Sequence, residues 1–141
     1  AAAPGWILTS GANGYQLLVY NYCHYSNLYR YRYQRLEQPQ DAYTVFEPGE
    51  NIRYQFLLSG LPDGIYRIER RIISRQNGSA FDKWLELGAP CYLRTDELRY
   101  LDEASRPAYR VEERRADGSL RLEVLVQPLE TVFLKLYPLD I

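Results

Sequence analysis

The side chains best suited to chemistry gather in one short stretch, residues 29–35, which reads Tyr-Arg-Tyr-Arg-Tyr-Gln-Arg. Tyrosine rings can stack on sugars or bases, and arginines can hold phosphates. The same two residue types are favoured at protein–protein contacts. Three interpretations stay open: a strand with tyrosines inward and arginines outward, an interface, and a ligand site. The candidate residues for an interface or for sugar stacking are Tyr29, Tyr31, Tyr33, Arg30 and Arg32.

The other reactive side chains are too few or too scattered to predict a site. His24 is the only histidine and follows Cys23, but neighbours on a strand point to opposite faces, so no dyad is expected. A zinc site needs three or four ligands, and Cys91 is the one further Cys or His in the chain. Glycine-rich phosphate loops are absent from the sequence. We therefore predict no catalytic residue, no metal and no cofactor.

Charged residues elsewhere fit solvated surfaces. Glycoside hydrolysis needs only two carboxylates at a set separation, and the 18 Asp and Glu residues cannot show such a separation by sequence alone. A second arginine group alternates with Glu69 and isoleucines and predicts a solvated or ion-paired strand face. Its members are Arg67, Arg70, Arg71 and Arg75.

Length and composition predict one globular domain over residues 1–141. The chain is 46% apolar and 25% charged, which excludes disorder, a collagen-like chain and a coiled coil. A net charge of -1 disfavours nucleic acid as a direct partner. No apolar run spans a membrane, and no signal peptide is visible at the start, so we expect a cytoplasmic location. The absence of Met and the three opening alanines predict a piece of a longer protein or a processed product. The two cysteines fit either a reducing compartment or a single bridge.

The elements that would position these residues are mostly strands. Alternating apolar residues mark half-buried strands at 52–58, 66–72, 120–126 and 132–136, and the apolar run 15–22 predicts a central strand covered on both faces. Turn sequences at 13–14, 62–64 and 117–118 predict hairpins. We expect a mainly β fold, an antiparallel β-sandwich of about seven or eight strands.

One or two short helices interrupt the strands. Ser79 is a predicted N-cap, and Gly88 a predicted stop. The stripe Phe81, Trp84 and Leu85 is assigned to the core. A second helix is expected from Thr95 to near Ser105, and residues 24–41 are expected to form a long loop.

Three segments in order resemble glycoside hydrolase family 39, the β-xylosidase family. Residues 77–90 (NGSAFDKWLELGAP) are similar to a loop, a short helix with Trp and a Gly-x-Pro stop. Residues 15–24 (YQLLVYNYCH) resemble the strand that follows the catalytic barrel. Residues 127–132 (QPLETV) resemble the opening of the last strand. The sequence is also similar to a variant of this family in which the hydrolase-like region follows an AraC-type helix-turn-helix regulator.

The resemblance implies an accessory β-sandwich without catalytic residues, because the two glutamates of that family lie on a (β/α)₈ barrel. Such a barrel needs roughly 250 residues. The first hypothesis is thus a non-catalytic domain, not itself an enzyme, that packs on a missing barrel of the same polypeptide. Further candidate partners are a second copy of the chain and xylo-oligosaccharides. The alternatives are a carbohydrate-binding module and a sugar-effector or dimerisation domain of an AraC-type regulator.

Overall fold

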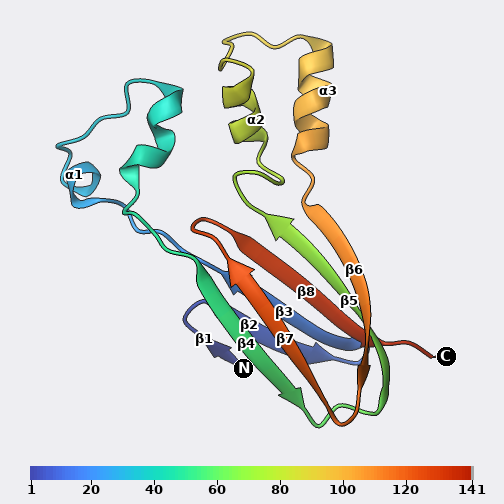
Figure 1. The fold of residues 1–141 in the computed structure, drawn as a ribbon. Helices are drawn as coiled ribbons and strands as arrows, with labels where there is room; N and C mark the ends of the chain where they lie inside the picture. Colours follow the sequence, from blue (N-terminus) through green and yellow to red (C-terminus); the bar gives the residue numbers. More distant parts are fainter. Residues whose placement is uncertain (141) are drawn as a thin grey trace.

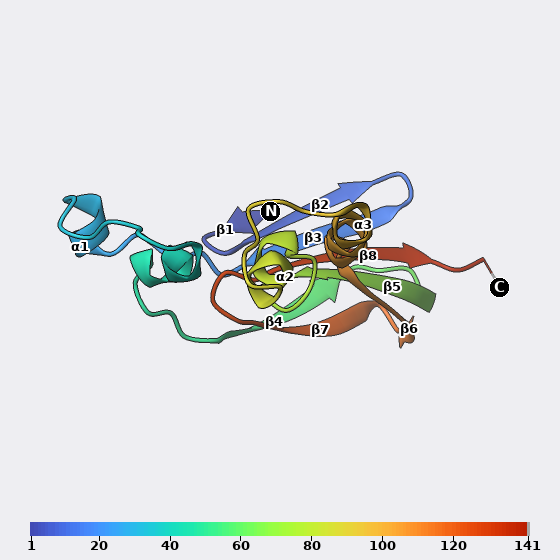
Figure 2. The same ribbon diagram turned by 90° about the horizontal axis from the view of Figure 1, so that it is seen from above.

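Two antiparallel sheets pack face to face in the computed structural model, which describes residues 1–140 (Figures 1 and 2). The larger sheet has the strand order β1-β2-β3-β8-β5-β6, and the smaller pairs β4 with β7. The strands are β1 (Ala2–Ala3), β2 (Trp6–Gly11), β3 (Gly14–Tyr20), β4 (Ile52–Ser59), β5 (Gly64–Ile73), β6 (Ala108–Ala116), β7 (Ser119–Val126) and β8 (Thr131–Pro138). The predicted antiparallel sandwich of seven or eight strands is confirmed.

The core lies between the sheets, where the period of two in the sequence places every second side chain. Exposed and buried residues alternate along the whole of β7, and half-buried and buried residues alternate in the same way along β8. Leu17, Leu134 and Val126 are fully buried. Each such side chain contributes about 1.5–3 kcal/mol by leaving water. Trp6 closes one side of this core with its ring edge-on to Phe56 at 5.4 Å between centroids.

The predicted hairpins are wrong at two of three turns. Only residues 13–14 join hydrogen-bonded neighbours, β2 and β3. The turn at 62–64 joins β4 to β5, and the turn at 117–118 joins β6 to β7; both therefore cross between the sheets. A tight turn reverses the chain but does not decide whether the flanking strands pair. The two crossing turns lie side by side, since the Gly118 N–H donates to the Asp63 carboxylate at 2.7 Å.

The β3 strand is central, but the prediction that both of its faces are covered is wrong. It pairs with β2 on one side and β8 on the other. Leu17 and Val19 face the core, whereas Gln16 is exposed and Leu18 is half-buried. The small sheet covers only one face of the large one (Figure 2), so the opposite side of β3 meets solvent.

Helices α2 (Ala80–Glu86) and α3 (Thr95–Ala104) form where the capping signals predict them. The Ser79 hydroxyl accepts from the Asp82 N–H, and Gly88 follows α2 with φ +91°. Both helices form an insertion between β5 and β6 that projects beyond the sheets (Figure 1). The assignment of Phe81, Trp84 and Leu85 to the core is therefore wrong. Trp84 and Leu85 are only partly buried and Phe81 is exposed, because α2 and α3 pack on each other and not on a sheet.

The expected long loop at 24–41 contains two short helical elements. Helix α1 (Asn27–Arg30) is capped by Ser26, and the 3₁₀ helix η1 (Pro39–Val45) begins on a proline. A β-bridge between Tyr25 and Phe46 closes the segment at its base. This insertion between β3 and β4 projects from the same end of the sandwich as α2 and α3 (Figure 1).

Candidate functional site

We call residues 24–47 the Tyr–Arg lobe, since they contain the stretch singled out by sequence. The interpretation of 29–35 as a strand is wrong: residues 27–30 are helical, and 31–34 turn back. Arg32 has φ +63°, which no extended strand allows. The backbone N–H groups of Tyr33 and Gln34 both donate to the Leu28 carbonyl, at 2.8 and 3.0 Å, and hold this turn.

The three candidate tyrosines have different surroundings in the lobe. Tyr29 is half-buried and its ring lies tilted 5.1 Å from that of Tyr25. Tyr25 in turn stacks on Phe46 with 5.3 Å between the ring centroids. Tyr31 and Tyr33 are 64% and 81% exposed. Tyr29 therefore helps to build the lobe, while Tyr31 and Tyr33 are available for contact.

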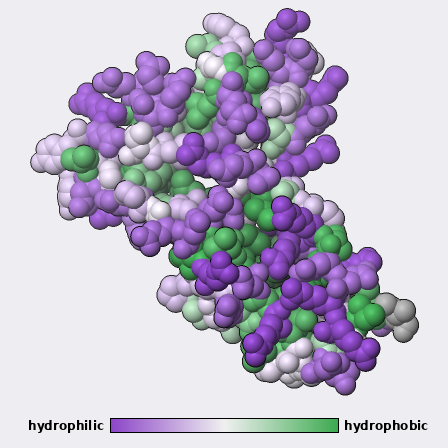
Figure 3. Space-filling view, viewed as in Figure 1, coloured by the Kyte–Doolittle hydropathy of each residue, from purple (hydrophilic) through white to green (hydrophobic). Residues whose placement is uncertain are grey.

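A shallow hollow of about 560 Å³ lies on the lobe. It brings together Tyr29, Arg30 and Arg32 from the set of candidate residues, whereas Tyr31 and Tyr33 do not line it. Its lining residues are Tyr25, Tyr29, Arg30, Arg32, Gln34, Arg35 and Leu36. The surface of the lobe is mainly hydrophilic (Figure 3, upper left). The wall of the hollow itself is mostly apolar, with the arginines and Gln34 as its polar groups. It is thus an open site suited to a ligand that has both an apolar face and polar groups.

A buried carboxylate ties the lobe to α2. The side chain of Asp82 is 8% exposed and accepts hydrogen bonds from the Tyr43 hydroxyl of η1, from Ser79 Oγ at 2.5 Å and from Arg75 Nε at 3.0 Å. The Arg75 guanidinium also lies 3.7 Å above the centre of the Tyr43 ring. This network was not predicted, because no local pattern in the sequence brings Tyr43 to Asp82.

The Asp82 network fixes the charge state of that carboxyl. Burial raises its pKa, but the hydrogen bonds from Ser79, Tyr43 and Arg75 outweigh burial, and the pKa lies below its usual value. Burial also raises the pKa of Tyr43, and its hydrogen bond to Asp82 raises it further. At neutral pH the tie is therefore an ionised carboxylate with a protonated phenol.

Glu130 is the second buried carboxylate. It is 9% exposed, and burial raises its pKa above the usual value. The other reactive side chains stay apart: Cys23 is buried, Cys91 is exposed, and both are free, so the single bridge allowed by the sequence is not formed. His24 is exposed with its ring edge-on to Tyr22 at 4.8 Å.

The second arginine group is ion-paired, as predicted. The partners of Arg67, Arg70, Arg71 and Arg75 are Glu113, Glu112, Glu69 and Asp82. Strand register explains one pair, because Arg67 and Glu113 lie opposite each other on β5 and β6. Glu69 and Arg71 are both on β5, whereas Arg75 lies beyond the end of β5 and pairs with Asp82 of α2, so the predicted strand face does not include it. All four guanidinium groups have an acidic partner, although Arg67 Nε is buried without a hydrogen-bond partner.

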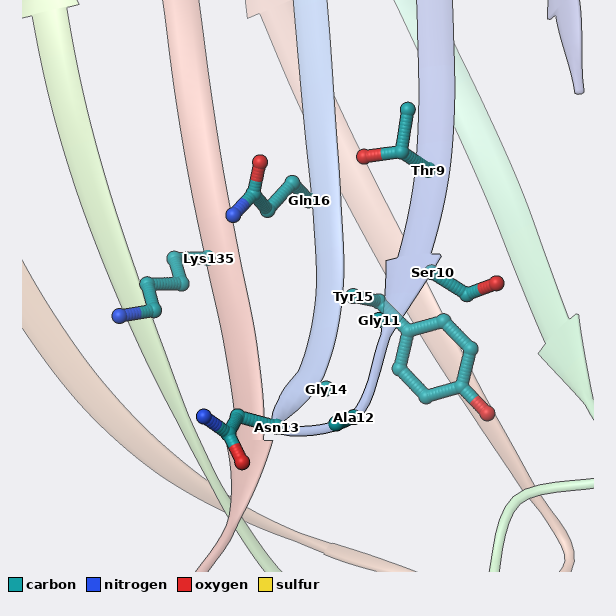
Figure 4. Close-up of a pocket in the computed structure, with 9 residues that line it drawn as sticks. All are labelled: Thr9, Ser10, Gly11, Ala12, Asn13, Gly14, Tyr15, Gln16 and Lys135. Atoms are coloured by element: carbon teal, nitrogen blue, oxygen red, sulfur yellow. The ribbon is translucent and has the colours of Figure 1, made fainter.

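Another hollow, of about 300 Å³, lies beside the turn between β2 and β3 (Figure 4). The side chains of Ser10 and Tyr15 point to one side of the hairpin, and those of Asn13, Gln16 and Lys135 to the other. Its polar groups therefore do not converge on one ligand. Within residues 1–140 there is no cluster of three or more Cys, His, Asp or Glu placed to hold a metal ion. No helix in the same range is long and apolar enough to cross a membrane.

Comparison by sequence finds neither a protein family nor a curated protein that matches this chain. Comparison by structure finds similar folds. A GH39 enzyme from Xanthomonas axonopodis pv. citri superposes with a TM-score of 0.73 at 19% identity, over 98% of this chain and 26% of its own. A monomeric β-xylosidase from Caulobacter crescentus superposes with a TM-score of 0.70 at 16% identity, over 99% of this chain and 27% of its own.

A bacterial orthologue of human α-L-iduronidase is a further structural neighbour, with a TM-score of 0.59 at 15% identity. It is covered over 22% of its length, while 96% of this chain is matched. This chain thus has the fold of one region of GH39 enzymes and spans about a quarter of their length. The fold expected from the family 39 resemblance is confirmed at this level.

Proposed function

We propose that this chain is a non-catalytic accessory β-sandwich domain of a glycosidase related to family 39. One observation carries the proposal: the GH39 match takes in 98% of this chain but only 26% of the enzyme. A (β/α)₈ barrel needs about 200 residues or more, and residues 1–140 are occupied by the two sheets and their insertions. Catalysis is accordingly assigned to another part of a longer polypeptide.

The contact with that catalytic domain, or with another subunit, is assigned to the exposed tyrosines of the Tyr–Arg lobe. Tyr31 and Tyr33 project to solvent and do not line the hollow. Tyrosine supplies a large, rigid contact area and is enriched in interfaces. The Tyr43–Asp82 tie would hold the lobe that carries these side chains against α2.

The proposal is tested by assaying this chain with an aryl β-xyloside. No hydrolysis above the uncatalysed rate is expected, with or without the substitution Glu130→Gln. Among the carboxyl groups of residues 1–140, Glu130 is the best suited to act as a general acid, because burial raises its pKa. Hydrolysis that disappears on substitution of Glu130, or of any other single carboxylate, would overturn the proposal.

A second measurement separates a packing domain from a carbohydrate-binding module. The thermal unfolding of the chain is followed with xylose, xylobiose and longer neutral xylo-oligosaccharides. A packing domain shows no saturable shift, whereas ligand at about 100 times its Kd would add about 2.7 kcal/mol of stability. A saturable shift with these neutral sugars, lost on Tyr29→Ala, would favour the binding module instead.

A further inference from the structure

The hollow of the Tyr–Arg lobe concentrates unpaired positive charge. Eight of the arginines form ion pairs within residues 1–140: Arg53, Arg67, Arg70, Arg71, Arg75, Arg94, Arg114 and Arg115. Arg30, Arg32 and Arg35 form none in that range, although all three line one hollow. No acidic residue lines it. Three guanidinium groups thus remain free to bind anions.

The backbone of the lobe argues against a phosphate ligand. Phosphate sites typically use free backbone N–H groups in addition to charged side chains. Here the N–H groups of residues 30–34 are all used inside the lobe, on the carbonyls of Ser26, Asn27, Leu28 and Tyr29. Recognition is left to side chains. Arginine forks bind carboxylates and phosphates alike in a bidentate geometry, so the occupied backbone N–H groups are the observation that favours a carboxylate here.

The remaining lining groups fit a sugar ring. Tyr25 and Tyr29 supply aromatic surface, and neither hydroxyl has a hydrogen-bond partner within residues 1–140. The Gln34 amide donates to Thr44 Oγ1 at 2.9 Å, which fixes its orientation and leaves its Oε1 as an acceptor for a sugar hydroxyl. A volume of about 560 Å³ is that of a small-molecule site.

We propose that this hollow binds an acidic saccharide, an oligomer of uronic acids. Three positively charged guanidinium groups can pair with more than one carboxylate. An oligomer, which carries one carboxylate on each sugar unit, therefore fits better than a monosaccharide. The volume of the hollow is that of a small-ligand site, and a whole-chain charge of -1 gives a nucleic acid no net attraction. This goes beyond the accessory role and is independent of the hydrolysis assay, because binding needs no catalytic group.

The test is a calorimetric titration of the chain with trigalacturonate at low and at physiological ionic strength. We expect saturable binding to the unaltered chain, weakened at least tenfold in the triple variant Arg30→Gln, Arg32→Gln, Arg35→Gln. The fully methyl-esterified trisaccharide, which keeps the sugar rings but not the charge, should bind at least tenfold more weakly than the acid. A variant Arg99→Gln, Arg106→Gln, Arg121→Gln changes the net charge equally and should bind like the unaltered chain.

Four outcomes would overturn the proposal. These are the absence of binding by trigalacturonate, equal binding of the methyl ester, equal weakening in the control triple variant, and displacement by inorganic phosphate at the same concentration. The last would identify a simple-anion site, and the third a general effect of charge. Far-UV circular dichroism of both triple variants shows that each is folded, so that lost binding reports on the hollow.

Discussion

Asp82 shows at the scale of the residue how a buried charge can connect two insertions. Its carboxylate gathers donors from three places along the chain: Ser79 at its own helix, Arg75 just before it, and Tyr43 from η1. Each donor offsets part of the cost of burying the charge. The network stabilises the chain only when all of its members are present, because the loss of one partner leaves a buried polar group without a hydrogen bond.

We expect Asp82→Asn to destabilise the chain by about 1–3 kcal/mol, as is typical when a buried hydrogen-bonded charge is disrupted. Since the pKa of Asp82 is lowered in the folded state, its contribution is present above the ordinary carboxyl pKa near 4 and is lost as pH falls through the lower folded value. Urea unfolding at a series of pH values measures this. The difference between the two proteins should shrink as the pH falls below about 4.

A matched control is Asp102→Asn, on the exposed surface of α3. It should leave stability within about 0.5 kcal/mol of the original. Equal losses from the two substitutions, or a loss at Asp82 that does not change with pH, would show that the network does not stabilise the ionised carboxylate.

At the scale of the element, similar turn sequences join different kinds of neighbour. The chain at 13–14 keeps β2 and β3 in one ladder, whereas at 117–118 it passes from the large sheet to the small one. The glycines at these turns therefore face different surroundings. Gly14 has φ +126° and lies against the backbone of β8, while Gly118 has φ +71° with open space around it.

Gly14→Ala should destabilise the chain more than Gly118→Ala. A Cβ atom at position 14 would come within 2.0 Å of the Leu136 carbonyl oxygen, so the backbone would have to move. At position 118 only the left-handed conformation is disfavoured, at about 1–2 kcal/mol. Chemical unfolding of the two variants measures the difference. Equal losses would mean that the β2–β3 turn can shift away from β8 without cost.

For the whole molecule, the crossings between layers matter most. The chain enters the small sheet twice, at β4 and at β7, and returns each time to the large one. The two sheets therefore cannot separate from each other without exposing the core that they share. Leu122 and Leu134 are almost fully buried in this core. The insertions project from one end and bury little against this core (Figure 1).

We expect the two sheets to unfold in one cooperative transition. In a Trp84→Phe variant the remaining tryptophan is Trp6, whose ring touches Phe56 of the opposite sheet. Its fluorescence and the far-UV circular dichroism of the strands should give coincident urea curves, as two-state unfolding requires. A fluorescence change that clearly precedes the loss of strand signal would show that the layers part first.

By itself, the sequence determined the local structure of this protein. The period of two in residues such as Leu120 and Leu122 specified strands and the face they bury, and Ser79 and Gly88 bounded a helix, because these signals act between near neighbours in the chain. Only the tertiary structure decided which strands pair and which turns cross between layers. It also brought Tyr43 to Asp82. Such contacts depend on packing between distant segments, which no local pattern encodes.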